Sequence, residues 1–187
     1  SENKAQPKVV GGNCYYEALK ANGTVWTWGY NGNGQLGVGD TNARTEPTQA
    51  KAEKILEDGT KEEELITDAI DIAASYNHTL ILRANGTVWS YGLNSSYELG
   101  NGTTKSTDIP VQVAFPENTK IKQIAIGNTH TLALDTEGHV WSWGYNGYGQ
   151  LGIGSTETKN RPTKTNIYDS KDEEEITDAI DVAAGYS

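Results

Sequence analysis

The chain of 187 residues contains one cysteine, one phenylalanine and no methionine. The single cysteine, Cys14, excludes an intrachain disulfide framework and a cysteine-based zinc site. No apolar run approaches the roughly 18 residues of a membrane-spanning helix, so we expect no membrane insertion. Basic residues are also scarce, with 15 Lys and Arg against 25 Asp and Glu. The resulting net charge of −10 argues against a nucleic-acid partner and against docking on anionic lipid.

Glycine and the polar aromatic residues are abundant instead, with 21 Gly, 10 Tyr and 5 Trp, a composition that suits short strands and tight turns.

Several short sequences recur along the chain. They are NGTVW at 22–26 and 85–89, WGYNG at 28–32 and 143–147, GQLG at 34–37 and 149–152, and ITDAID at 66–71 and 176–181. Such recurrence indicates a repeat architecture. The repeat region spans 9–187, after an N-terminal extension of residues 1–8. It holds three repeats, at about 12–74, 75–126 and 127–184, and the start of a fourth at Gly185.

Each repeat has the pattern of antiparallel strands. Apolar residues alternate at 131–134, turn residues follow at 135–138, and alternation resumes at 139–143, which predicts a hairpin. The same hairpin is expected around Asn22 and Asn85, because Asn-Gly is a strong turn signal. Short antiparallel strands with periodic glycine and aromatic residues predict an all-β fold. At this repeat length the expected architecture is a β-propeller with about three four-stranded blades in this chain.

The repeats resemble the regulator-of-chromosome-condensation repeat family. Its pattern runs Ala-Gly-x-x-His-Thr-Leu-x-Leu, then Asp/Asn-Gly-x-Val-Trp, then Trp-Gly-x-Asn-x-x-Gly-Gln-Leu-Gly. Residues 77–80 and 128–134 carry the first part, and residues 29–37 and 144–152 carry the last. The resemblance implies a closed ring that usually has about seven blades. Three repeats would therefore form only a partial propeller.

The first repeat departs from this pattern. It reads NCYYE at residues 13–17, where the other repeats have His-Thr-Leu at the last three positions, as YNHTL at 76–80 and NTHTL at 128–132. Glu17 thereby takes the apolar position that Leu80 and Leu132 hold in the other repeats. Because a buried, unpaired carboxylate is costly, we expect this strand at an edge or its charge paired.

Two acidic inserts, at about 51–65 and 166–175, lengthen the first and third repeats. Neither insert has the glycine-containing spacing of a calcium-binding loop. We expect solvated, partly mobile loops. The alternative is that the inserts dock a basic partner.

No stretch carries a catalytic or metal-binding signature, so we expect no enzyme activity, no cofactor and no metal. His78 and His130 occupy equivalent repeat positions and should lie in different blades, each bonded within its own blade. His139 follows a turn and is expected to be exposed. Cys14 lacks an activating motif and is expected to be a free thiol in a strand.

The glycine-rich loops carry the candidate partner-binding residues. These are Tyr30, Asn31, Asn33, Tyr97, Tyr145 and Tyr148. Tyrosine and asparagine on loops held by a rigid scaffold make a contact surface with little entropy to lose. The alternative is that some of these tyrosines pack between blades.

Two functional classes follow from the sequence. The first is a non-enzymatic protein-interaction module, since the resemblance implies platforms such as exchange factors for small GTPases and inhibitors of secreted enzymes. No stretch matches the wedge or motif on which those two activities depend, so the protein partner stays unnamed. The second is a structural role, either a partial propeller completed by self-association or an excerpt of a larger surface protein without binding activity of its own. A homo-oligomer is expected, with a dimer of three plus three blades favoured. Scarce arginine and absent disulfides are compatible with the exterior or cell surface of a bacterium.

Overall fold

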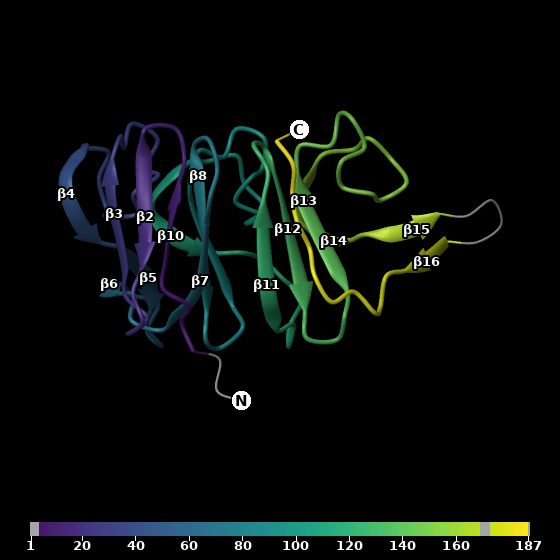
Figure 1. Cartoon of the computed structure of the whole chain (residues 1–187), viewed down its shortest axis with the longest axis horizontal. Helices are drawn as coiled ribbons and strands as arrows, with labels where there is room; N and C mark the ends of the chain where they lie inside the picture. Colours follow the sequence, from purple (N-terminus) through teal and green to yellow (C-terminus); the bar gives the residue numbers. More distant parts are fainter. Residues whose placement is uncertain (1–3, 169–172, 187) are drawn as a thin grey trace.

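The computed structural model describes residues 4–168 and 173–186 and contains no helix among them. Three four-stranded antiparallel sheets lie side by side along the long axis of the molecule (Figure 1). Each sheet is one blade, which confirms the predicted all-β partial propeller. No described segment forms a helix that is long and apolar enough to cross a membrane.

The strands of each blade follow one another in the sheet in an up-and-down order. Blade 1 consists of β1 (Lys8–Gly11), β2 (Tyr15–Leu19), β3 (Val25–Gly29) and β4 (Arg44–Gln49). Blade 2 consists of β7 (Ala69–Ala74), β8 (His78–Arg83), β9 (Val88–Gly92) and β10 (Thr107–Gln112). Blade 3 consists of β11 (Ile121–Ile126), β12 (His130–Asp135), β13 (Val140–Gly144) and β14 (Lys159–Lys164).

Blade boundaries are shifted from the sequence repeats by one strand. β7 belongs to the predicted repeat 12–74, but it pairs with β8 and forms the first strand of blade 2. β1 has the corresponding place in blade 1 and begins at Lys8, within the segment that the sequence assigns to the extension. The first strand of each blade therefore precedes the sequence repeat that supplies the other three.

The hairpin turns hold neighbouring blades in register. Gly23 adopts φ of +80°, and a β-carbon there would lie 2.4 Å from the carbonyl oxygen of Thr67. The carbonyl oxygen of Gly23 accepts a hydrogen bond of 3.0 Å from the backbone amide of Ala69. The Asn-Gly turn of one blade thus fixes the chain as it enters the next blade, and a larger residue would push the two apart.

The apolar core lies between the blades. Leu19, Val25, Ile72 and Ile81 pack between blades 1 and 2 and are at most 2% exposed. A second cluster, which includes Leu80, Val88, Ile121 and Trp143, fills the space between blades 2 and 3. Burial of this kind is the main stabilising contribution in a fold of stacked sheets.

Glu17 lies in the interface between blades 1 and 2 and is completely buried. Its Oε1 accepts a hydrogen bond of 2.5 Å from the hydroxyl of Tyr91. Burial raises the pKa of the Glu17 carboxyl well above its usual range, against the opposing effects of the Tyr91 hydroxyl and the Lys8 charge. The expectation of an edge strand or a paired charge is thus corrected, because β2 lies between β1 and β3 and the raised pKa favours the protonated, uncharged form of the Glu17 carboxyl.

The acidic inserts form hairpins where the sequence suggested loops. β5 (Lys51–Ile55) pairs with β6 (Lys61–Leu65), and β15 (Asn166–Tyr168) pairs with β16 (Glu173–Glu175). Cross-strand ion pairs explain the difference: Lys51 lies 2.8 Å from Glu63. Residues 169–172, which follow β15 in the sequence, lie outside the described part of the chain.

Candidate protein-interaction surface

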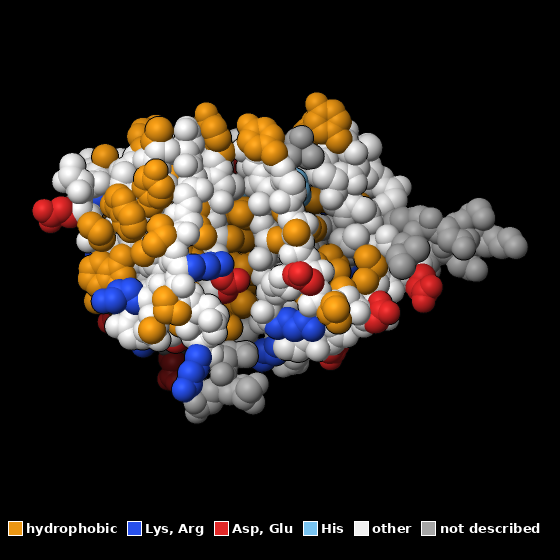
Figure 2. Space-filling model, viewed as in Figure 1, with side chains coloured by type: hydrophobic (Ala, Val, Ile, Leu, Met, Phe, Trp, Pro, Cys, Tyr) orange, Lys and Arg blue, Asp and Glu red, His pale blue; other side chains and the backbone are white. Residues whose placement is uncertain are grey.

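One end of the molecule gathers the loops in which the sequence placed the candidate contacts. Because strands alternate in direction, the loops after β3, β9 and β13 emerge at the same end as the turns after β1, β7 and β11. This is the upper end in Figure 1. Hydrophobic side chains protrude along this edge in Figure 2, whereas charged side chains lie mostly toward the opposite end.

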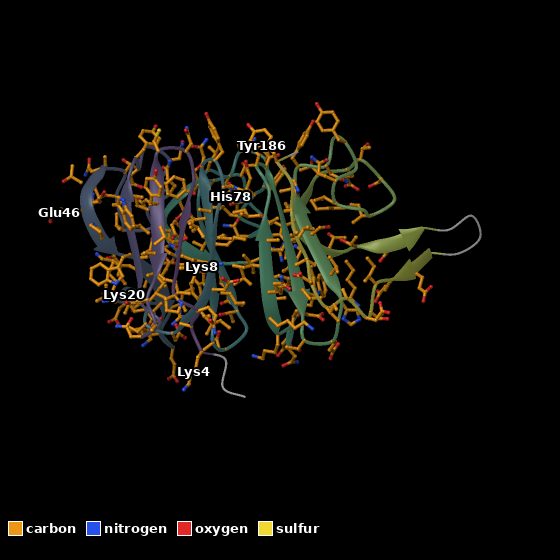
Figure 3. All side chains as sticks on the ribbon, in the orientation of Figure 1. Lys4, Lys8, Lys20, Glu46, His78 and Tyr186 are labelled. Carbon is orange, nitrogen blue, oxygen red and sulfur yellow. The ribbon has the colours of Figure 1, made fainter. Side chains whose placement is uncertain are left out.

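Tyrosines dominate this end, and we call them the tyrosine face. It consists of the exposed Tyr30, Tyr76, Tyr148 and Tyr186 and the half-buried Tyr145. Tyr148 is 82% exposed, Tyr186 is 72% exposed, and Tyr30 and Tyr76 are each 48% exposed. Figure 3 shows Tyr186 at the upper edge and Lys4 at the lower edge.

Two members of the tyrosine face are new. Tyr76 and Tyr186 occupy equivalent positions in the turn after the first strand of a blade, and the backbone of each accepts a hydrogen bond of 3.1 Å from the preceding blade. The sequence signal was available in the matching ASYN and AGYS segments.

The predicted tyrosines are held in place by their own loops. The phenol ring of Tyr30 lies over Gly32, and the ring of Tyr145 lies over Gly147 in the same way. Tyr145 and Tyr148 meet edge to face, with ring centroids 6.0 Å apart. Tyr97 is less accessible and adopts φ of +64°, at the position where the other two loops have glycine.

Asn31 is not a surface contact. Its side chain is completely buried, as are those of Asn94 and Asn146 at the equivalent positions. The Asn31 amide donates hydrogen bonds of 2.8 and 2.9 Å to the carbonyls of Asp40 and Asn42, and its oxygen accepts one of 3.0 Å from the amide of Leu36. The asparagine therefore pins the loop that presents Tyr30. Asn33 remains half-buried at the loop surface.

A pocket opens between the turns of successive blades at the tyrosine face. It has a volume of about 440 Å³ and is lined by Gly12, Asn13, Tyr76, Asn128 and Tyr186, among others. Its walls combine aromatic rings with asparagine side chains and backbone polar groups.

The histidines do not form a metal centre among the described residues. His78 Nδ1 lies 2.7 Å from the hydroxyl of Ser75 in its own blade, as expected from the sequence. Burial, and then the proximity of His130, lower the pKa of His78 to about 3. Both rings are therefore neutral side chains of the blade interior at physiological pH.

His139 differs from its prediction, since its side chain is only 16% exposed. With Asp135 and Glu137 it forms a group whose possible ligand atoms lie within 4.8 Å of one another. The Asp135 carboxylate already accepts hydrogen bonds from the backbone amides of Glu137 and His139 and from the indole of Trp141. Burial alone would raise the pKa of Asp135, but these hydrogen bonds lower it. The group caps a hairpin turn.

Comparison with known proteins identifies the repeats. The family model of the Regulator of chromosome condensation (RCC1) repeat matches residues 22–82, 85–134 and 137–187. The chain is 34% identical to the RCC1 domain-containing protein RUG3, mitochondrial, of Arabidopsis thaliana, over 79% of this chain and 32% of that protein. It is 33% identical to the ultraviolet-B receptor UVR8 of Arabidopsis thaliana, over 86% of this chain and 34% of that protein. The chain thus spans about a third of these relatives.

Solved structures agree with this assignment. Human WBSCR16 superposes with a TM-score of 0.69 at 26% identity, over 86% of this chain and 38% of that chain. Yeast RCC1 (Prp20), solved with Kap60, superposes with a TM-score of 0.68 at 23% identity, over 98% of this chain and 40% of that chain, and supports the fold alone. The chain therefore belongs to the regulator of chromosome condensation (RCC1) repeat family and contributes three blades of its β-propeller.

Proposed function

We propose that the chain is a non-enzymatic protein-interaction module and that its partner binds the tyrosine face. The observation that carries this proposal is the gathering of tyrosines from three blades at one end of the molecule, where four of them are exposed and two, Tyr76 and Tyr186, line one pocket. Tyrosine is enriched in the residues that contribute most to protein interfaces, because its ring buries a large area and loses little rotamer entropy. Loops pinned by buried asparagines lower the ordering cost further.

The test combines the changes Tyr30→Ala, Tyr145→Ala and Tyr148→Ala in one variant. Partners are captured on the immobilised chain from an extract of the source organism and quantified by mass spectrometry. We expect the triple variant to lose at least 10-fold of the captured partner, since one interface tyrosine contributes about 1–2 kcal/mol or more. The far-UV circular dichroism of the variant should stay unchanged. The rings of Tyr30 and Tyr148 are exposed, so their removal leaves the core intact.

The matched control changes exposed apolar residues away from the tyrosine face. Ile55 and Leu65 are 65% and 51% exposed on the β5–β6 hairpin, and their replacement by alanine should leave capture unchanged. Equal loss in both variants would mean that capture follows general hydrophobic contact. Unfolding of the triple variant would mean that the rings are structural, which would contradict the proposal.

Self-association is the second candidate, and one observation favours it. The sheet face of blade 1 that points away from blade 2 exposes half of Tyr16, which stacks on Trp28 with centroids 5.7 Å apart. Repeat proteins cover such a terminal face with a cap or a neighbour. We propose that a second copy covers it, with a dimer favoured because two identical contacts close a ring. The mass in solution, measured by light scattering across a concentration series, tests this: a monomer at every concentration would contradict it.

A further inference from the structure

We infer that the turn between β12 and β13 binds a divalent metal ion, and that zinc is the ion that fits it best. Three side chains supply the ligand atoms: the carboxylates of Asp135 and Glu137 and the Nδ1 atom of His139. The sequence predicted no metal because the segment lacks a complete zinc or calcium signature. The inference goes beyond the proposed function, since this turn lies at the other end of β12 from the tyrosine face (Figure 1).

The three ligand atoms lie close to the separation that a metal ion requires. His139 Nδ1 is 3.0 Å from Asp135 Oδ2 and 3.7 Å from Glu137 Oε2. Tetrahedral zinc with bonds of about 2.0–2.2 Å holds its ligand atoms about 3.3–3.6 Å apart. The Glu137 side chain is 79% exposed and free to rotate toward the other two ligands. The site therefore needs little rearrangement to accept an ion.

Asp135 is held by donors that aim one of its oxygens at the site. Its Oδ1 accepts hydrogen bonds of 2.9 Å from the backbone amides of Glu137 and His139. Its Oδ2 accepts one of 3.0 Å from the indole of Trp141, which is only 7% exposed. An oxygen that accepts one such bond keeps a further lone pair for a metal. Carboxylates that bind metals are oriented by hydrogen bonds of this kind.

The ring of His139 has the surroundings of a metal-bound imidazole. Its Nδ1 faces the two carboxylates, so Nε2 is the nitrogen that would carry the proton when a metal is bound. This Nε2 lies 3.8 Å from Oε2 of Glu175, in β16. Lys164 in turn holds Glu175 at 2.7 Å. Metal-binding histidines usually direct their second nitrogen at a carboxylate or a carbonyl, which fixes the ring and its tautomer.

The equivalent turns of blades 1 and 2 show what this turn requires when it only caps a hairpin. At the three ligand positions blade 1 has Lys20, Asn22 and Thr24, and blade 2 has Arg83, Asn85 and Thr87. In each of these turns the asparagine oxygen accepts from the amide two residues on. The threonine hydroxyl accepts from the indole of the next tryptophan. Capping therefore needs neither a carboxylate nor an imidazole.

The composition of the turn in blade 3 thus calls for another explanation. All three positions differ from those of both other blades, and all three carry residue types that bind metals. Asp135 brings a negative charge to the position where the other turns have Lys20 and Arg83. Two carboxylates and a neutral imidazole form a ligand set whose charge a divalent cation neutralises.

The ligand set and the adjacent pocket select the kind of ion. A pocket of about 370 Å³ opens beside the turn and is lined by all three ligand residues, Trp141 and Lys164, among others. It gives an ion a path from solvent and leaves room for water at the remaining coordination position. An imidazole ligand favours zinc and the late first-row metals, whereas calcium and magnesium prefer oxygen ligands alone.

The first test titrates the chain with Zn²⁺ alone, and with Ca²⁺ alone, by calorimetry. We expect one saturable Zn²⁺ site per chain, with an affinity at least about 10-fold higher than that for Ca²⁺. Equal affinity for the two ions, or no saturable Zn²⁺ binding, would overturn the site.

Nuclear magnetic resonance of the histidine rings locates the bound ion. The chain has three histidines, and His78 and His130 are buried side chains of the blade interior that serve as internal references. Zn²⁺ should shift the ring signals of His139 and leave the other two in place. A shift of His78 or His130 without one of His139 would contradict the assignment.

Two variants give the turn the composition of the other blades. His139→Thr and Glu137→Asn each introduce the residue that blades 1 and 2 have at that position, so the hairpin should fold as it does there. We expect His139→Thr to weaken Zn²⁺ binding by at least about 10-fold, and Glu137→Asn to weaken it less, because Glu137 is the most exposed of the three ligands. Unchanged affinity in His139→Thr, with unchanged far-UV circular dichroism, would overturn the inference.

Glu157→Gln is the matched control for the loss of one negative charge. Glu157 is 71% exposed in the loop after β13, where it pairs with Lys159. Its replacement should leave the affinity for Zn²⁺ unchanged. Equal weakening by Glu157→Gln and Glu137→Asn would show that zinc is only a diffuse counterion of an acidic chain, which would refute the site. The triple tyrosine variant should bind Zn²⁺ like the unchanged chain, so partner capture is tested separately.

Discussion

At the scale of single residues, Glu17 shows how a neighbouring blade sets the chemistry of a side chain. In the folded chain its pKa is raised, chiefly by burial, whereas in the unfolded chain a Glu has a pKa of about 4.3. The folded state therefore binds a proton that the unfolded state releases above about pH 4.3. The stabilisation is complete below that pH and is lost as the pH rises toward the folded pKa.

We expect Glu17→Gln to remove this pH dependence. Glutamine is isosteric and stays neutral, and its oxygen still accepts from the Tyr91 hydroxyl. As the pH rises from about 4.3 toward the raised pKa of the folded state, the free energy of unfolding of the unchanged chain should fall relative to the variant, by up to about 1.4 kcal/mol per pH unit. Urea unfolding at several pH values measures this difference. Parallel curves for the two proteins would show that Glu17 is ionised in the folded state.

At the scale of elements, the β5–β6 hairpin combines a packed base with a solvated tip. Ala52 is completely buried against the core between blades 1 and 2. Glu64 pairs at 3.2 Å with Arg83, a side chain only 13% exposed that also pairs with Asp68 at 2.7 Å. Beyond this base the turn at 56–59 is mostly exposed. The insert is therefore part of the blade interface near the sheet and dispensable farther out.

We expect the tip to be removable. Replacing residues 54–62 with Asn-Gly should shift the melting temperature by only a few degrees, because a change in surface-loop length has a small entropic effect of about 0.6 kcal/mol per doubling. Ala52→Asp should instead destabilise the chain by about 2–4 kcal/mol, since it buries an unpaired charge. Calorimetry measures both. A large loss of stability in the shortened variant would show that the tip is packed as well.

At the scale of the whole molecule, the blades are coupled through shared cores. Each apolar cluster receives side chains from two adjacent blades, so a blade that unfolds exposes the face of its neighbour. Nearest-neighbour interfaces of this kind make a short repeat array unfold cooperatively. The three blades should therefore behave as a single unit.

Trp143→Ala tests this coupling. Trp143 is completely buried between blades 2 and 3, so its loss should destabilise the chain by about 3–5 kcal/mol. Unfolding should nevertheless remain a single transition, seen at the same urea concentration by circular dichroism and by tryptophan fluorescence. Transitions at two different urea concentrations would mean that blade 3 unfolds independently. Trp26→Ala, in a half-buried position, should have a smaller effect.

The sequence by itself determined the fold. The recurrence of NGTVW and GQLG, with two-residue alternation between them, defines hairpins whose side-chain periodicity is local. The glycine-rich loops also identified Tyr30, Tyr145 and Tyr148 as candidate contact residues, because the loop sequence recurs along the chain with the same glycines. Local patterns are readable without a structure because turn chemistry and strand alternation depend on neighbouring residues.

Only the tertiary structure decided the features that depend on contacts between blades. Asn31 looks like a surface residue in sequence, yet its amide finds carbonyl partners 9 and 11 residues away and is buried. Glu17 looks like an edge residue, yet Tyr91, 74 positions along the chain, supplies its hydrogen bond. The shift of one strand between sequence repeats and blades, by which β7 joins the sheet of blade 2, also became visible only in the folded structure. Sequence periodicity specifies which face of a strand is apolar, but the packing partner of that face is fixed only when the chain folds back on itself.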